Sequence, residues 1–145
     1  IYVANGTTTL NNGKFDGARL DEEQRTLRQF YRQLLRVART EKAITQGEMY
    51  DLEYAQGEGF NRHEHYAYIR KYKKEILLVV LNFDDRQCDI SVRIPQEAFA
   101  HLQQPEYAMV EAVDLLTNTK FPFSAHTPVC LTLPAWKGMI LKIKQ

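Results

Sequence analysis

The feature that most constrains the fold of this chain is a change in hydrophobic period at Gly47. Upstream of this glycine, over residues 21–40, apolar side chains recur at the spacing of one face of an amphipathic helix. Downstream of it, short segments alternate between apolar and polar residues, as β-strands do. The apolar stripe of the expected helix consists of Leu27, Phe30, Tyr31, Leu34, Leu35 and Ala38. The sequence therefore predicts one long helix followed by an all-β domain.

Both ends of the expected helix carry recognisable signals. Asp21 suits the N-cap position, and Gln24 follows it at the spacing of a capping box. Arg39 falls in the last turn, where the helix dipole favours positive charge. The helix is therefore predicted over 21–40, and residues 1–19, which are rich in turn-forming residues, are predicted to form an irregular lead-in.

The β-region contains short segments separated by turn-forming residues. The continuously apolar run 76–81 predicts a central strand covered on both faces. The segment 88–94 alternates cleanly and predicts a strand with one solvated face, in which Cys88 is a small buried residue. Residues 95–100 are expected to form a single helical turn. The expected strands are 48–55, 65–72, 75–83, 88–94, 107–115, 129–133 and 137–144. This spacing predicts a mainly β fold, an antiparallel, Greek-key-like β-sandwich preceded by one long N-terminal helix.

Composition and charge exclude several classes of function. The 145 residues are enough for a self-sufficient core. A net charge of +1 gives no reason to expect a nucleic acid or a membrane as partner, and no segment has the apolar length of a membrane span. Cys88 and Cys130 do not make a disulfide framework, although a single disulfide between them stays open. Because the chain begins at Ile1, we expect it to be part of a longer protein, with any signal peptide upstream.

Several stretches resemble, in their order and spacing, the C-terminal end of the α-amylase family of glycoside hydrolases. Asn-Gly-Lys-Phe-Asp-Gly at 12–17, together with 20–24 and 27–35, is similar to the last barrel helix, and 43–50 is similar to the join to the C-terminal domain. Leu-Val-Val-Leu-Asn-Phe at 78–83 is similar to the central strand of that domain. The segment 113–118 is similar to a late hairpin, and 133–141 is similar to the final turn and strand. The likeness covers residues 12–144. One departure is Asn118, where the family often has glycine.

The resemblance implies a (β/α)₈ barrel followed by an all-β domain, of which this chain holds only the end. Residues 1–46 would then be the lead-in and the last barrel helix, and residues 47–145 the C-terminal sandwich. The family cleaves α-glucosidic bonds with two carboxyl groups about 5 Å apart, placed at the C-terminal ends of barrel strands. Because those strands precede the last helix, the resemblance implies that this segment has no catalytic residue, needs no cofactor and is inactive alone.

Two short motifs suggest chemistry that we do not assign to this chain. Gly-Phe-Asn-Arg-His at 59–63 is only superficially similar to the family's nucleophile motif, because His63 stands where a carboxylate is needed. We interpret 59–63 as a hairpin loop. His63 and His65 would share one face of an extended strand and could bind a metal, but no third ligand lies nearby in the sequence. We therefore predict a solvated pair and no metal site.

Aromatic rings are the candidate carbohydrate-binding groups. Tyr66, Tyr68 and Tyr72 would line one face of a strand, and Trp136, the only tryptophan, falls in an expected turn. Rings of this kind can stack on the apolar face of a sugar. The alternative, which we favour, is that the tyrosines are half-buried on the sheet and that Trp136 plugs the end of the sandwich.

Two functions follow from these patterns and from the resemblance. In the first, the domain is non-catalytic and covers and stabilises the catalytic barrel of the same parent chain, which acts on α-glucans. Its contact residues would be Leu27, Phe30, Tyr31, Leu34 and Leu35, and the isolated fragment would self-associate through this apolar patch. In the second, the sandwich is an α-glucan (starch)-binding module that uses Trp136, Tyr66 or Tyr68. The sequence specifies neither the compartment nor the parent's substrate.

Overall fold

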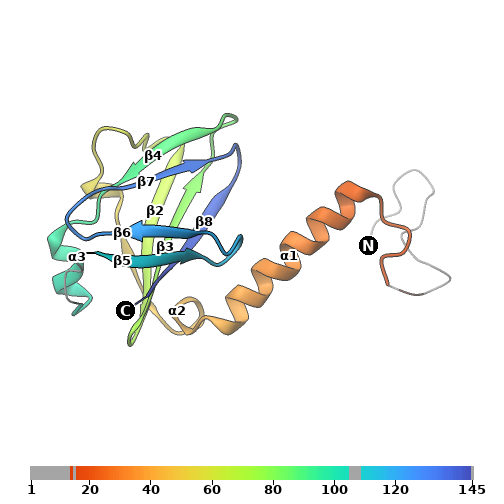
Figure 1. The fold of residues 1–145 in the computed structure, drawn as a ribbon, viewed down its shortest axis with the longest axis horizontal. Helices are drawn as coiled ribbons and strands as arrows, with labels where there is room; N and C mark the ends of the chain where they lie inside the picture. The colour runs from red at the N-terminus through yellow and green to blue at the C-terminus, as the bar shows by residue number, and fades with distance from the viewer. Residues whose placement is uncertain (1–13, 15, 105–108, 145) are drawn as a thin grey trace. The chain divides into compact units, whose positions relative to one another are not determined.

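The computed structural model of the chain describes residues 14, 16–104 and 109–144. Contacts divide the chain into two units, Ile1–Val37 and Ala38–Gln145, and each is described by itself. The first unit contains most of one long helix, and the second contains the β-strands (Figure 1). The predicted fold class is confirmed, because the chain is mainly β, with antiparallel strands that follow a long helix. Within the described residues, no helix is long and apolar enough to cross a membrane.

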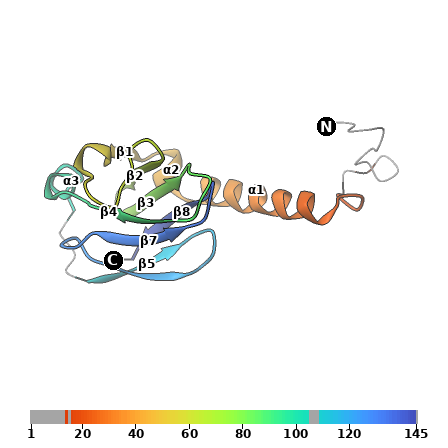
Figure 2. The same ribbon diagram turned by 90° about the horizontal axis from the view of Figure 1, so that it is seen from above.

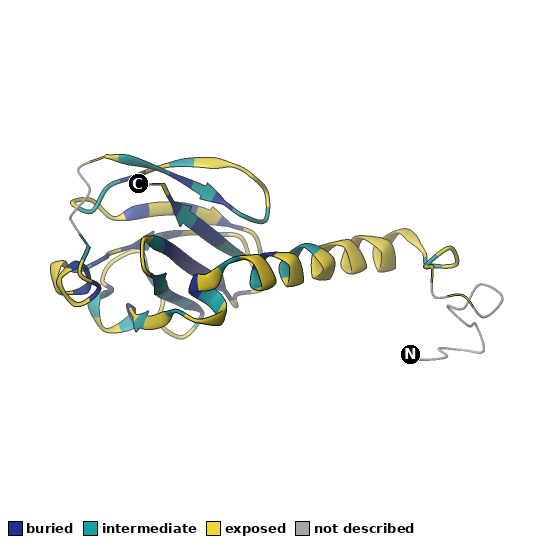
Figure 3. Ribbon diagram, turned by 90° about the horizontal axis from the view of Figure 1, so that it is seen from below, coloured by how far each residue is buried: buried dark blue, intermediate teal, exposed yellow. Residues whose placement is uncertain are grey.

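Helix α1 (Glu22–Thr40) begins where its sequence signals predicted. Asp21 and Gln24 form a reciprocal capping box, in which the Gln24 backbone N–H donates to Asp21 Oδ1 at 2.8 Å and the Asp21 N–H donates to Gln24 Oε1 at 3.2 Å. Most of the helix is exposed (Figure 3). The exposed side chains include Leu27, Phe30, Tyr31 and Leu35 of the apolar stripe, whereas Leu34 is half-buried.

The Ala38–Gln145 unit contains two antiparallel sheets (Figure 2). The larger sheet has six strands in the order β1-β2-β3-β8-β5-β6, and the smaller pairs β4 with β7. The strands are β1 (Glu48–Asp51), β2 (His65–Tyr72), β3 (Glu75–Asn82), β4 (Cys88–Val92), β5 (Val110–Asp114), β6 (Lys120–Phe123), β7 (Val129–Leu133) and β8 (Gly138–Ile143).

The hydrophobic core lies between the two sheets. One face of the central strand β3 contributes Ile76, Leu78 and Val80 to a single cluster of buried side chains. The small sheet contributes Ile90, Val92, Leu131 and Leu133 to the same cluster. Leu77 and Val79 of β3 are also buried, although alternation along the strand places them on the opposite face. This confirms the prediction that the apolar run 76–81 forms a central strand covered on both faces.

Short helices complete this unit, namely α2 (Lys42–Thr45), the 3₁₀ helix η1 (Glu53–Ala55) and α3 (Gln96–His101). Side chains of the sheet hold α2 at both ends. Glu75 Oε1 accepts the Ala43 N–H at 2.7 Å, and the Arg70 guanidinium donates to the carbonyls of Ala43 at 2.9 Å and Ile44 at 2.7 Å. Gly47 follows α2, and a Cβ there would collide with carbonyl oxygens of the neighbouring backbone. This close approach requires glycine at the point where the hydrophobic period changes.

Some elements depart from the predicted ranges, and each departure has a physical cause. β1 ends at Asp51 because the chain turns into η1 instead of continuing as a strand. β6 was not predicted, since Pro122 lacks an N–H and suits only an edge strand, the position that β6 occupies. Cys88 is half-buried rather than buried, and both it and Cys130 are free thiols, so they form no disulfide. The beginnings of the lead-in and of the strand expected over 107–115 lie outside the described residues.

Candidate functional site

The six-stranded sheet has a second apolar face, on the side opposite the core. Directly opposed residues of an antiparallel pair lie on the same face of a sheet. Tyr68 is opposed to Val79, and Val79 is opposed to Ile140, so one face continues across β2, β3 and β8. We call this the outer face. Its apolar and aromatic residues on β1, β2, β3 and β8 are Met49, Tyr66, Tyr68, Tyr72, Leu77, Val79, Leu81 and Ile140, so the three tyrosines share one face as predicted.

Exposure varies across the outer face. Leu77, Val79 and Ile140 are buried, yet they do not belong to the core cluster between the sheets. Met49 is 46% exposed, and Phe83, which directly follows β3, is 53% exposed. The Phe83 N–H donates to the Glu64 carbonyl at 2.7 Å, so the β2–β3 ladder continues to Phe83. Arg70, Glu75 and Lys142 lie on the same face, so its apolar part is confined to the remaining positions, although an antiparallel sheet commonly has one fully polar, solvated side.

Tyr66 and Tyr68 lie on this outer face, as the sequence predicted for one side of a strand. Both are half-buried, and their ring centroids are 5.6 Å apart with an interplanar angle of 40°. Burial raises the pKa of Tyr66, and the carboxylates of Asp51 and Glu53 raise it further. Its phenol therefore stays neutral and remains a hydrogen-bond donor.

Trp136 lies in the turn between β7 and β8 and is 67% exposed, so the interpretation that it plugs the end of the sandwich is wrong. Its φ is 56°, a left-handed conformation that is rare for a bulky residue. The Trp136 N–H donates to the Asp84 carbonyl at 3.2 Å, and the Asn82 N–H donates to the Lys137 carbonyl at 2.8 Å. These bonds tie the tryptophan turn to the end of β3, next to Phe83.

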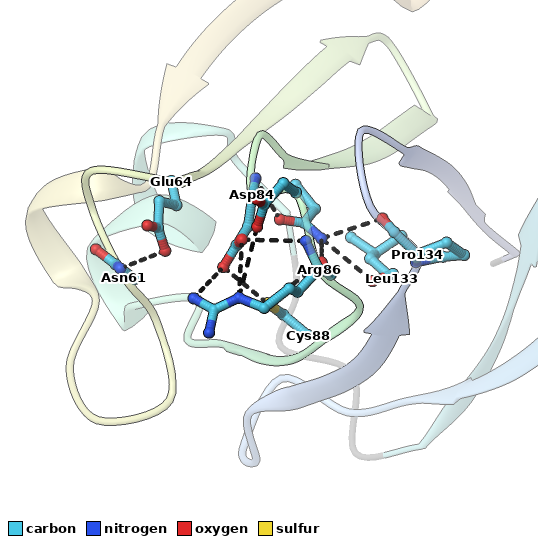
Figure 4. A network of polar contacts seen from close by, with 9 residues as sticks. Asn61, Glu64, Asp84, Arg86, Cys88, Leu133 and Pro134 are labelled. Carbon is cyan, nitrogen blue, oxygen red and sulfur yellow. Dashed lines mark hydrogen bonds and ion pairs between the residues drawn. The ribbon is translucent and has the colours of Figure 1, made fainter.

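A polar network holds the same turn from inside (Figure 4). The buried Asn82 amide donates to the carbonyls of Arg86 at 2.9 Å, Leu133 at 3.2 Å and Pro134 at 3.0 Å. Its Oδ1 accepts the Asp84 N–H at 2.9 Å. One buried side chain thus joins the β3–β4 turn to the end of β7.

Asp84 and Cys88 complete this network. Burial alone would raise the pKa of the Asp84 carboxyl, but its contacts with Asp85, Arg86 and Cys88 outweigh burial and hold the pKa well below its usual range. Burial, followed by the hydrogen bond to Asp84, raises the pKa of the Cys88 thiol. Asp84 and Cys88 thus extend the hydrogen bonds that hold the β3–β4 turn, since Asp84 also accepts the Arg86 N–H at 3.1 Å.

The histidines and the loop that the sequence singled out do not form a site. Residues 59–63 lie in turns that precede β2, as the hairpin-loop interpretation requires. His63 is exposed as predicted, but the prediction of a solvated pair is wrong for His65, which is buried at the start of β2, where its Nδ1 accepts the Asn61 N–H at 3.1 Å. Over 16–104 and 109–144, the described stretches, histidine, cysteine and carboxylate side chains form no group of three that could hold a metal.

An aromatic cluster that the sequence analysis missed lies at the edge of the larger sheet. We call it the Tyr50 cluster, and it consists of Tyr50 on β1, Tyr54 on η1 and His101 at the end of α3. The two phenol oxygens are 2.6 Å apart, and the Tyr50 and His101 ring centroids are 5.2 Å apart. Tyr50 and Tyr54 are close in sequence, but only the tertiary fold brings His101 beside them, so no local pattern could have identified the cluster.

Comparison with known proteins gives a family. Residues 60–140 match the sequence model of the family described as Maltogenic Amylase, C-terminal domain. The chain belongs to this family. As predicted, this maltogenic amylase C-terminal domain corresponds to the C-terminal region of an α-amylase-family glycoside hydrolase. The comparison with curated proteins gave no match.

Solved structures share the fold of this maltogenic amylase C-terminal domain at low sequence identity. A variant of AmyP in complex with maltotriose superposes with a TM-score of 0.68 at 18% identity over 92% of this chain and 24% of that chain. AmyP in complex with maltose gives 0.64 at 18% identity, over 86% and 22%. An Anoxybacillus α-amylase gives 0.61 at 15% identity, over 87% and 23%. The chain thus spans roughly a quarter of the length of these enzymes.

Proposed function

We propose that this domain is non-catalytic and that it covers and stabilises the catalytic barrel of its own parent chain, an enzyme that acts on α-glucans. The observation that carries the proposal is the outer face, a second apolar face on a sheet whose first face already packs against the core. The family match supports the assignment to such an enzyme.

The outer face has the character of an interface rather than of a solvated surface. Contiguous exposed apolar patches mark sites of interaction with another protein surface. Met49 and Phe83 are each about half exposed, and register places them on the same face as the buried Val79 and Ile140. Burying the exposed part of each large side chain would contribute about 1 kcal/mol. A barrel packed here would therefore stabilise the pair of domains appreciably.

The path by which the polypeptide enters the sandwich also supports a barrel packed on the outer face. α2 packs on β2 and β3, held by Arg70 and Glu75. Lys142 Nζ lies 2.6 Å from a carboxylate oxygen of Glu41 and 3.7 Å from one of Glu75. Arg70 is opposed to Leu77, and both Lys142 and Glu75 belong to the same face by register. The polypeptide therefore enters the sandwich on its outer face.

The exposed stripe of α1 supplies the other part of the proposed interface. Leu27, Phe30, Tyr31 and Leu35 are exposed, and Leu34 is half-buried. Because helices rarely leave such a stripe in water, we assign these residues to the contact with the barrel. We also keep the division into 1–46, resembling the last barrel helix, and 47–145, the sandwich. The proposal assigns no catalytic residue, metal or cofactor to this chain.

A second candidate function is α-glucan binding by Trp136, Tyr66 and Tyr68. The left-handed, highly exposed Trp136 favours it, since strained conformations often persist at functional positions. Tyr66 and Tyr68, however, lie within the outer face, where the barrel and a sugar would compete for them.

Co-purification tests the barrel-covering proposal. The 145-residue chain is produced separately from the upstream part of its parent protein, and the two are mixed. We expect them to associate and expect Phe83→Glu to weaken association at least tenfold. Tyr54→Glu, at a similarly exposed aromatic residue outside the outer face, is the matched control and should leave association unchanged. Equal binding by the wild-type chain and Phe83→Glu would reject the outer face as the contact.

A further inference from the structure

We propose that the Tyr50 cluster is a binding site for a neutral α-glucan chain, separate from the outer face. The inference rests on the proposed function in one respect, because it takes the substrate class of the parent enzyme as α-glucan. The position, rigidity and chemistry of Tyr50, Tyr54 and His101 support the site independently of barrel docking.

The position of the cluster keeps it clear of the outer face. Tyr50 is opposed to Ile69, a core residue, and packs against the core cluster from the edge strand β1. Its ring therefore belongs to the opposite side of the sheet from Tyr68, which is opposed to Asp51. Tyr54 is 58% exposed, and the His101 side chain is 59% exposed. A barrel on the outer face would leave this edge accessible.

The loop that carries Tyr54 is rigidly held, although the ring itself is exposed. The buried Gln56 side chain donates to the carbonyls of Leu52 and Arg93, each at 2.8 Å, and accepts the Arg93 N–H at 2.9 Å. The Arg62 guanidinium donates to the Gln56 carbonyl at 2.8 Å and to the Tyr54 carbonyl at 3.4 Å. An exposed ring on a fixed loop loses little entropy on binding a ligand, which is the advantage of a preorganised site.

The Tyr50 ring lies against both other rings of the cluster, at an angle to each. Its centroid is 6.3 Å from that of Tyr54, with an interplanar angle of 62°, and 5.2 Å from that of His101, with an interplanar angle of 48°. His101 Nε2 lies 3.9 Å from a carboxylate oxygen of Glu48. The apolar face of a pyranose can pack on such rings, while hydroxyl groups at its rim reach the phenols, the imidazole and the carboxylate.

The charges around the cluster select a neutral ligand. The hydrogen bond with Tyr50 raises the pKa of Tyr54 to about 12, with smaller contributions from burial and from the carboxylates of Glu97 and Asp51. Tyr54 is thus neutral, and the carboxylates of Glu97 and Asp51 act on it, whereas the guanidinium of Arg62 is engaged with backbone carbonyls. Acidic groups repel an anionic ligand but accept hydrogen bonds from sugar hydroxyls. An uncharged polyhydroxylated chain fits this environment.

Isothermal titration of the 145-residue chain with maltoheptaose tests the inference. We expect binding that Tyr54→Ala and His101→Ala each weaken about five- to tenfold, as loss of one stacking partner predicts. Tyr54→Phe keeps the ring and should stay within about twofold of the wild type. Thermal unfolding followed by circular dichroism verifies that each variant is folded. The β-linked cellohexaose, tested in parallel, should bind more weakly.

The controls separate this inference from the two proposed functions. Trp136→Ala, which removes the tryptophan of the second candidate function, should weaken maltoheptaose binding less than Tyr54→Ala does. If Trp136→Ala abolished binding and Tyr54→Ala did not, the glucan site would be that of the second candidate function and the inference would be overturned. Absence of any binding, or equal losses in Tyr54→Phe and Tyr54→Ala, would also overturn it. None of these results bears on barrel docking, whose readout is association with the upstream domain.

Discussion

At the scale of single residues, buried polar side chains determine how firmly the sandwich is held. His65 shows this most clearly. Its Nδ1 accepts the Asn61 N–H, which places the proton of the neutral imidazole on Nε2. Among the described residues, Nε2 has no hydrogen-bond partner. Burial lowers the pKa of His65, and the carboxylates of Glu64 and Asp84 only partly oppose this effect.

Stability should therefore fall as the pH drops below about 6.5, the usual pKa of an unfolded histidine. Between that value and the lowered pKa of folded His65, the unfolded chain binds one more proton than the folded chain, so acid favours unfolding. Urea unfolding at pH 7.0 and 5.5 should show the decrease, with a slope of at most about 1.4 kcal/mol per pH unit. His65→Gln should flatten the dependence, whereas the exposed His63→Gln should not; the same slope in both variants would contradict this account.

Removing the Asn82 side chain should lower the free energy of unfolding strongly, because its amide donates to three backbone carbonyls. Asn82→Ala would leave the carbonyls of Leu133 and Pro134 without their donor in a largely buried setting. Leaving buried polar groups unsatisfied in this way should destabilise the domain by about 2–4 kcal/mol. Urea unfolding measures the difference, with the exposed Asn61→Ala as control; a change below about 1 kcal/mol in Asn82→Ala would show that the network is dispensable.

At the scale of elements, α2 is held by the sheet rather than by its own helix propensity, since it has only four residues. Arg70→Ala should release two charge-assisted bonds to α2 carbonyls and destabilise the domain by about 1–3 kcal/mol. Arg70→Lys can keep one of the two bonds and should fall between the wild type and Arg70→Ala. Thermal unfolding of the three proteins tests the order, and an Arg70→Ala protein as stable as wild type would disprove the role of Arg70.

The elements that the sequence predicted well are those specified locally. The capping box of Asp21 and Gln24 identifies the start of α1, and the apolar run of β3 identifies the central strand. The elements that were missed depend on tertiary context. Pro122 conceals β6 because a proline is acceptable only once the strand lies at an edge, and no sequence pattern specifies that position.

Local sequence patterns likewise predicted only part of the candidate surfaces. Strand alternation correctly placed Tyr66 and Tyr68 on one face. It did not show that Phe83 belongs with them, because this requires the β2–β3 register. The Tyr50 cluster depends on the packing of α3 against β1, which is not encoded at a recognisable spacing.

At the scale of the whole molecule, we propose that the outer face of the six-stranded sheet is an interior surface of a larger enzyme. The core between the two sheets is complete without this face, yet Leu77, Val79 and Ile140 make it apolar. The exposed Phe83 and Met49 would then be covered in the parent protein, as would the apolar stripe of α1.

Cysteine labelling of the intact parent enzyme measures directly whether the outer face is covered. In a background in which the exposed Cys130 is replaced by serine, Phe83→Cys should react with a maleimide at least tenfold more slowly in the parent enzyme than in the 145-residue chain. Tyr54→Cys, outside the outer face, should react at similar rates in both. Rapid labelling of Phe83→Cys in the folded parent enzyme would show that the outer face is open to solvent and is not packed against the barrel.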